Sequence, residues 1–271
     1  MNGMPRRRRP TSSRTDVSAR VRAKIHPASE LPHNQNFLVY GDSGAGKTRF
    51  AATAPKVLVM DVNDKGHDSV RRDINPDFIQ IEYWREVIDI YWFLQEGDHP
   101  YESFAVDTVS NLQNICMDFV LGDEAARDAS RDPDMPSRQT WGKVGKLMRT
   151  QITNFRNLPL NVIFVAQLRA KQTGDDEDED SEILYGPEVS PSIEKTLKAA
   201  VGTIGYLTKR EVVIRNKKTK TARKEIRRRL LLGDSEHYIS KDRNGVFPEY
   251  VDAPDLADML EQIYEGGSNS G

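Results

Sequence analysis

Short apolar runs alternate with amphipathic segments along most of the chain. The runs span five to seven residues and carry few polar side chains, a pattern typical of strands that are buried on both faces. Such strands are predicted at 36–40, 57–61, 103–108 and 161–167, and residues 78–83 alternate between apolar and polar as a further strand.

Between these runs, apolar residues recur at the spacing of one face of a helix. Helices are predicted to begin near Lys47 and to cover 85–94, 112–120, 141–155, 192–200 and 256–263, with Trp141 on the core-facing side of its helix. Charged stretches with few apolar residues predict loops at 122–140 and from 168 to about 190.

The alternation of strands and helices predicts an α/β fold, in which a mainly parallel central sheet is covered by helices on both faces. Strands near 203–214, 225–232 and 237–241 are joined in part by a short basic turn. They predict a C-terminal antiparallel extension of the sheet.

Charge divides the chain further, although the net charge is only −2. Residues 1–25 carry eight Lys and Arg against one aspartate, and residues 209–229 carry eleven against two glutamates. Residues 168–190 instead hold eight carboxylates against two cations. We therefore expect a disordered basic arm at 1–30, one α/β domain at 31–266 with an acidic flexible loop at 168–190, and a disordered tail at 267–271.

Composition excludes several classes of protein. The single cysteine, Cys116, leaves no intramolecular disulfide, and the five histidines show no ligand spacing with it, so no zinc site is expected. No apolar run is long enough for a membrane span or a secretory signal. The sequence predicts a soluble, cytoplasmic protein without a membrane partner.

Residues 41–48 read GDSGAGKT, the pattern G-x-x-x-x-G-K-[ST] between a predicted strand and a predicted helix. In this motif backbone N–H groups surround phosphates, the lysine reaches the β- and γ-phosphates, and the hydroxyl binds Mg²⁺. The alternative is a glycine-rich turn without a ligand. The predicted nucleotide-binding residues are Gly41, Asp42, Ser43, Gly44, Ala45, Gly46, Lys47 and Thr48.

An Mg²⁺ bound to a hydroxyl and to phosphates also needs a carboxylate at the end of a neighbouring strand. Asp107 ends the apolar run SFAVD and is predicted to join Thr48 at the metal. The alternative is that Asp107 only caps the helix that begins near Ser110. A GTPase is not favoured because NKKT at 216–219 lacks the base-reading aspartate, and a small-molecule kinase is not favoured because the long loop is acidic.

Over about 36–251, the chain resembles RecA-like ATPases, most closely the phage-encoded proteins that act as single-strand annealing recombinases. The resemblance rests on GDSGAGKT, VLVMD, AVDTVSNL, NVIFVAQLRAK and YISKDRNGVFP in this order. It implies ATP and Mg²⁺ as cofactors and a ring or filament of identical subunits. It also implies that Gln167 senses the γ-phosphate and that Lys241 and Arg243 reach the nucleotide of a neighbouring subunit.

Two features depart from that family. Asn63 stands where the resemblance implies a catalytic glutamate, so Asp61 or Asp64 would have to substitute and hydrolysis is expected to be slow. The acidic segment 173–182 stands where a DNA-binding loop is implied, and it should repel phosphates. It is either a mobile acidic insertion or a DNA mimic that docks on a basic surface until single-stranded DNA displaces it.

The functional prediction is a slowly hydrolysing ATPase that binds single-stranded DNA and promotes annealing or strand pairing in phage recombination, with phage or host recombination proteins as partners. DNA is expected to contact the arginines at 6–9 and the basic segment 215–229. The alternatives are a phage helicase, helicase loader or motor on the same core, and a nucleotide-gated adaptor without a role on DNA.

Overall fold

The computed structural model describes residues 14–27, 30, 33–63, 65–128, 135–173, 182–215 and 222–268. The chain divides into two compact units, residues 1–33 and 34–271. The first contains helix α1 (Arg14–Arg22), which lies within the arm predicted at 1–30. The second contains all the other elements.

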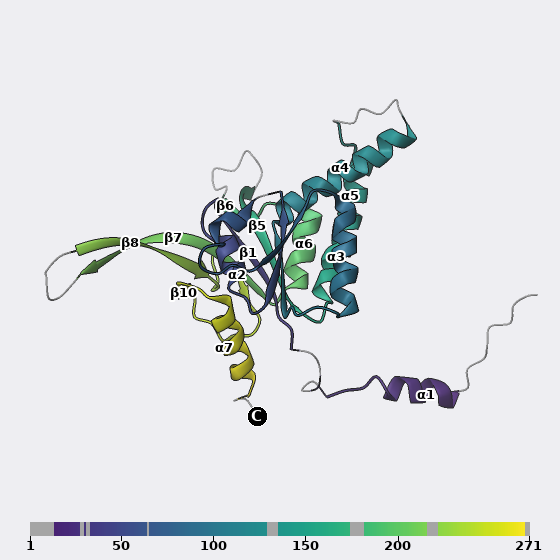
Figure 1. Ribbon diagram of the computed structural model, residues 1–271, viewed down its shortest axis with the longest axis horizontal. Helices are drawn as coiled ribbons and strands as arrows, with labels where there is room; N and C mark the ends of the chain where they lie inside the picture. Colours follow the sequence, from purple (N-terminus) through teal and green to yellow (C-terminus); the bar gives the residue numbers. More distant parts are fainter. Residues whose placement is uncertain are drawn as a thin grey trace, which may run out of the picture. The chain divides into compact units, whose positions relative to one another are not determined.

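A ten-stranded sheet forms the centre of the second unit (Figure 1). Six neighbouring strands run parallel in the order β7-β1-β5-β4-β2-β3, and β8 and β10 extend this sheet antiparallel beyond β7. The strands are β1 (Asn36–Gly41), β2 (Val57–Val62), β3 (Asp77–Ile81), β4 (Ser103–Asp107), β5 (Asn161–Thr173), β6 (Glu182–Pro187), β7 (Thr203–Arg215), β8 (Ala222–Leu231), β9 (Lys241–Asp242) and β10 (Tyr250–Asp252).

Helices cover both faces of the sheet, as predicted. They are α2 (Lys47–Ala52), the 3₁₀ turn η2 (Gly66–Ser69), α3 (Trp84–Glu96), α4 (Val109–Arg127), α5 (Arg138–Arg156), α6 (Pro191–Ala200) and α7 (Leu256–Ser268). Figure 1 shows α3, α4, α5 and α6 together on one side of the sheet and α7 on the other.

The side-chain alternation along β1 shows how the two faces are separated. Leu38 and Tyr40 belong to the apolar cluster that the helices α3 to α6 complete. Phe37 and Val39 belong to the second cluster, which α2 and α7 complete. Because neighbouring strand residues point to opposite faces, a strand covered on both sides is apolar at successive positions, which explains the unbroken run FLVY at 37–40.

Several predicted boundaries are wrong. The loop predicted at 122–140 is helical at both ends, in α4 to Arg127 and in α5 from Arg138. The flexible loop predicted at 168–190 is an antiparallel pair, β5 with β6, in its described parts, whereas 174–181 lies outside the described residues. The strand predicted at 237–241 shortens to β9, and α7 continues into the tail predicted at 267–271.

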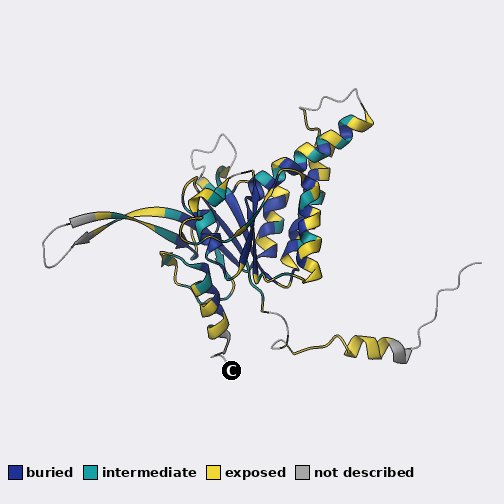
Figure 2. Ribbon diagram, in the orientation of Figure 1, coloured by how far each residue is buried: buried dark blue, intermediate teal, exposed yellow. Residues whose placement is uncertain are grey.

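The strands β7 and β8 form a long hairpin that extends beyond the helical layers (Figure 2). Its outer part is exposed, with side chains such as Ile226 and Val213 open to solvent, while Leu207 and Leu230 at its base are buried. None of the described helices combines the length and the apolar character needed to cross a membrane.

Candidate functional site

The loop from Gly41 to Thr48, hereafter the P-loop, joins the carboxyl end of β1 to α2. Gly44 and Gly46 have φ values of 73° and 102°, which side chains other than glycine rarely adopt. At Gly41, an added Cβ would collide with the carbonyl oxygen of Leu207 on β7. The glycines of the motif are therefore required both by the turn itself and by the adjoining strand.

Lys47 is buried at the start of α2, and its ammonium group lies inside the loop. Its Nζ donates hydrogen bonds to the carbonyl oxygens of Gly41 at 2.8 Å and Asp42 at 2.9 Å, and to Oε1 of Gln167 at 2.9 Å. A lysine ammonium has three donors, and these acceptors satisfy all of them. The structure thus brings Lys47 into contact with Gln167 of β5, another residue predicted for the site.

Thr48 and Asp107 also meet, as the sequence predicted. The Oγ1 of Thr48 donates a hydrogen bond of 2.6 Å to Oδ2 of Asp107, the buried last residue of β4. A hydroxyl and a carboxylate at this separation are both oxygen ligands of the kind that Mg²⁺ prefers. Helix α4 is instead capped by Thr108, whose side chain accepts from the N–H of Asn111, so the capping alternative for Asp107 is wrong.

The segment after β2 covers this pair. A Cβ added at Gly66 would lie 3.2 Å from Oγ1 of Thr48 and 3.3 Å from Oδ2 of Asp107, so the backbone of this segment packs tightly against the pair. The next residue, His67, places Nδ1 3.4 Å from Oδ2 of the buried Asp61. The sequence predicted Asp61 but not His67, and Asp64 lies outside the described residues.

A protein-family model described as an AAA domain matches residues 33–244, which is most of the chain. The chain belongs to the AAA domain family. Among solved structures, the flagellar accessory protein FlaH from Methanocaldococcus jannaschii is similar, with a TM-score of 0.35 and 10% identity over 89% of this chain and 91% of FlaH. No curated protein matches the chain. The α/β architecture has the mostly parallel sheet, the helices on both faces and the antiparallel C-terminal strands that the sequence predicts.

Lys241 and Arg243 lie near the opposite end of the sheet of this AAA domain from its own P-loop. Lys241 is opposite Ile204, near the start of β7, whereas the P-loop follows the end of β1. Its Nζ donates to the carbonyl oxygens of Lys198 at 3.0 Å and Val201 at 2.7 Å, at the end of α6. Burial, and then the neighbouring charge of Arg243, lower the pKa of Lys241. Neither side chain joins the site within one chain.

A second hollow of about 480 Å³ lies beside Arg169 of β5. It is lined by Trp141, Arg169, Asn114 and Glu188 among others. Trp141 is 44% exposed, so its predicted place in the core is wrong: it occupies the first turn of α5, before the apolar stripe reaches the sheet. The hollow adjoins the P-loop site through Ser110, which lines it and accepts a hydrogen bond from the N–H of Gln167.

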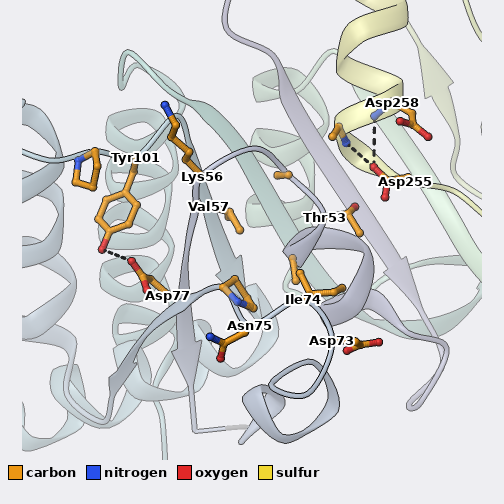
Figure 3. Close-up of a pocket in the computed structure, with 15 residues that line it drawn as sticks. Thr53, Lys56, Val57, Asp73, Ile74, Asn75, Asp77, Tyr101, Asp255 and Asp258 are labelled. Carbon is orange, nitrogen blue, oxygen red and sulfur yellow. Dashed lines mark hydrogen bonds between the residues drawn. The ribbon is translucent and has the colours of Figure 1, made fainter.

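A larger hollow than this one, about 790 Å³, lies elsewhere (Figure 3). It is open, is lined by Lys56, Asp73, Tyr101 and the first turn of α7, and includes no P-loop residue. Most of its carboxylates already have partners, such as Arg49 for Asp73 and the Tyr101 hydroxyl for Asp77. We therefore assign the functional site to the P-loop and not to this groove.

Proposed function

We propose that this AAA domain binds ATP with Mg²⁺, hydrolyses it slowly, binds single-stranded DNA and promotes annealing or strand pairing in phage recombination. The observation that carries the proposal is the convergence of Lys47, Thr48, Asp107 and Gln167 where β1 and β4 end and Gln167 of β5 lies beside Gly41. In open α/β sheets, ligands bind at this end of the strands.

The residues present fit a magnesium-bound triphosphate. The positive φ values of Gly44 and Gly46 leave the loop without side chains where phosphates would lie, and Lys47 would supply a positive charge to them. Thr48 and Asp107 would hold the metal, which would neutralise charge on the phosphates when bound. Gln167, already in contact with Lys47, would report the state of the terminal phosphate to β5.

Slow hydrolysis is supported by the residues after β2. Asn63 has a φ of 55°, a left-handed conformation that asparagine tolerates well, and its amide cannot accept a proton from water. Asp61, the described alternative, is buried and lies beside His67. We therefore expect tight nucleotide binding together with a low turnover number.

DNA binding is supported by the hollow beside Gln167. Exposed aromatic rings provide stacking surfaces for single-stranded bases, and arginines provide positive charge for the phosphates. Here Trp141 would be the stacking surface and Arg169 would contact a phosphate. The exposed part of the β7–β8 hairpin adds sequence-independent attraction for phosphates. ATP at the P-loop would influence this surface through Gln167 and Ser110.

An assembly of identical subunits, ring or filament, is the further part of the proposal. Lys241 and Arg243 lie far from the P-loop of their own chain, which suits a role at the nucleotide of a neighbour. Phage or host recombination proteins would be the protein partners, and the bacterial cytoplasm would be the place of action.

The test is ATP turnover by the wild type and by Lys47→Ala, each with and without single-stranded DNA, together with DNA binding at two salt concentrations. We expect weak turnover that requires Lys47, and DNA binding that weakens as salt rises. Turnover on the order of 10 s⁻¹ or above would contradict the slow-hydrolysis part. If DNA neither binds nor stimulates, the recombination role is wrong and a nucleotide-gated adaptor remains.

A further inference from the structure

Two cations of the β7–β8 hairpin lie against the P-loop. Lys209 and Arg228 are direct neighbours in the register of the two strands, so their side chains share one face of the hairpin. A Cβ added at Gly46 would lie 2.8 Å from Cδ and 3.0 Å from Cζ of Arg228. One added at Gly44 would lie 3.8 Å from Nζ of Lys209. Both side chains therefore reach the glycines that form the proposed phosphate site.

These two cations differ from the others of the hairpin in their partners. Among the described residues, no ion pair involves Lys209 or Arg228, and Nε of Arg228 is buried without a hydrogen-bond acceptor. Three neighbouring cations do have carboxylate partners: Lys224 with Glu211 at 2.7 Å, Arg227 with Glu225 at 3.2 Å and Arg229 with Asp252 at 2.6 Å.

This arrangement is unfavourable unless an anion is bound nearby. Like charges directly opposite each other on neighbouring strands repel, and a buried donor without an acceptor costs free energy. A phosphate between the hairpin and the P-loop would relieve both costs. An arginine suits this position because its guanidinium can donate two parallel hydrogen bonds to a phosphate.

The order of the strands determines which phosphate this would be. The contacts of Lys47 and Thr48 with Gln167 and Asp107 lie on the side of β1 that faces β5 and β4. Lys209 and Arg228 lie on the other side, where β7 and β8 follow β1. A nucleotide whose terminal phosphate meets Gln167 and Asp107 would extend from there toward the hairpin.

We propose that Arg228, assisted by Lys209, binds the phosphates on the nucleoside side of a nucleoside di- or triphosphate held by the P-loop of the same chain. The proposal rests on the proposed nucleotide site. It separates the base of the hairpin, which would serve the nucleotide, from the exposed cations further along it, which remain available to a polyanion.

The test is the affinity of the full-length chain for Mg-ATP and for ADP, measured by calorimetry for Arg228→Gln and Gln167→Ala. The Arg228→Gln variant loses one charged hydrogen-bonding group. It should therefore bind both ATP and ADP roughly 10- to 100-fold more weakly than the wild type. Gln167→Ala should weaken ATP binding more than ADP binding, because Gln167 faces the terminal phosphate. Arg227→Gln, one residue away and paired with Glu225, is the matched control and should stay within about twofold of the wild type for both nucleotides.

Wild-type affinity of Arg228→Gln for both nucleotides would overturn the proposal, and a loss confined to ATP would overturn the placement on the nucleoside side. Thermal melting without nucleotide checks that each variant is folded. If Arg228→Gln does not fold, Arg228→Lys and Lys209→Gln carry the same test, and both should bind ATP and ADP more weakly than Arg227→Gln does. A wild type that binds no nucleotide would instead refute the proposed function itself, a result visible before any variant is made.

Discussion

The replacement Gly46→Ala tests whether the P-loop requires its unusual backbone. Gly46 has a φ of 102° and a ψ of 28°, a conformation that costs a residue with a Cβ about 1–3 kcal/mol. The new methyl group would also lie within 3.0 Å of the Arg228 guanidinium carbon, so that side chain must move. We expect the free energy of unfolding to fall by at least the backbone cost.

For a domain of this size, each 1 kcal/mol lowers the melting temperature by about 2–4 °C, so the expected loss is about 2–12 °C. The assay is thermal unfolding without nucleotide, followed by titration with Mg-ATP. The double variant Gly46→Ala/Arg228→Ala separates the two causes: it should recover the part that comes from the collision and retain the part that comes from the backbone.

Gly122→Ala is the matched control. Gly122 lies inside α4, and an added Cβ there would meet nothing within 4 Å. Because alanine is a better helix former than glycine, this change should raise the free energy of unfolding by about 0.5–1 kcal/mol. The reasoning would be refuted if the melting temperature of Gly46→Ala were equal to or higher than that of the wild type and the variant bound ATP with wild-type affinity.

Three further predictions concern other parts of the domain. Asp107→Asn should bind ATP as the wild type does in the absence of Mg²⁺. The factor by which Mg²⁺ increases ATP affinity, measured by titration with and without the metal, should be about tenfold or more smaller in this variant than in the wild type. Trp141→Ala should lower affinity for single-stranded DNA by about 1–3 kcal/mol in a filter-binding assay, while an unchanged affinity would exclude the ring as a stacking surface. Burial raises the pKa of the Cys116 thiol to about 12, so the folded protein keeps a proton that the unfolded chain loses near pH 8.5. The buried, protonated thiol therefore contributes fully to stability below about pH 8.5, and this contribution declines as the pH rises toward 12. In urea unfolding across that range, the free energy of unfolding of Cys116→Ala should decline less steeply than that of the wild type.

The strands that carry the site could be predicted from the sequence because both of their faces are buried. Between its terminal Asn161 and Gln167, the run NVIFVAQ has no polar residue that could face solvent, so it admits few other interpretations. The motif residues followed from the same runs, because parallel strands bring their carboxyl ends to one edge. Thr48, Asp107, Lys47 and Gln167 meet there as expected.

The β5–β6 pair and the cationic contacts with the P-loop could not be predicted in this way. The strand β6 and the second half of β5 carry polar and charged residues, so their pattern is also that of a loop. Arg228 is one of eleven cations between 209 and 229, and only the register of β7 with β8 shows that it faces Gly46. The exposure of Trp141 likewise depends on where α5 begins, and helix ends are set by capping residues such as Ser137 more than by apolar spacing.

The binding of Mg-ATP to the wild type and to Lys47→Ala, compared by calorimetry, tests the central claim most directly. The site described here predicts saturable binding by the wild type and a loss of at least tenfold in the variant, because the ammonium group of Lys47 is the positive charge inside the loop. Equal affinity of the two proteins, or no binding by the wild type, would contradict the assignment of this P-loop as a nucleotide site.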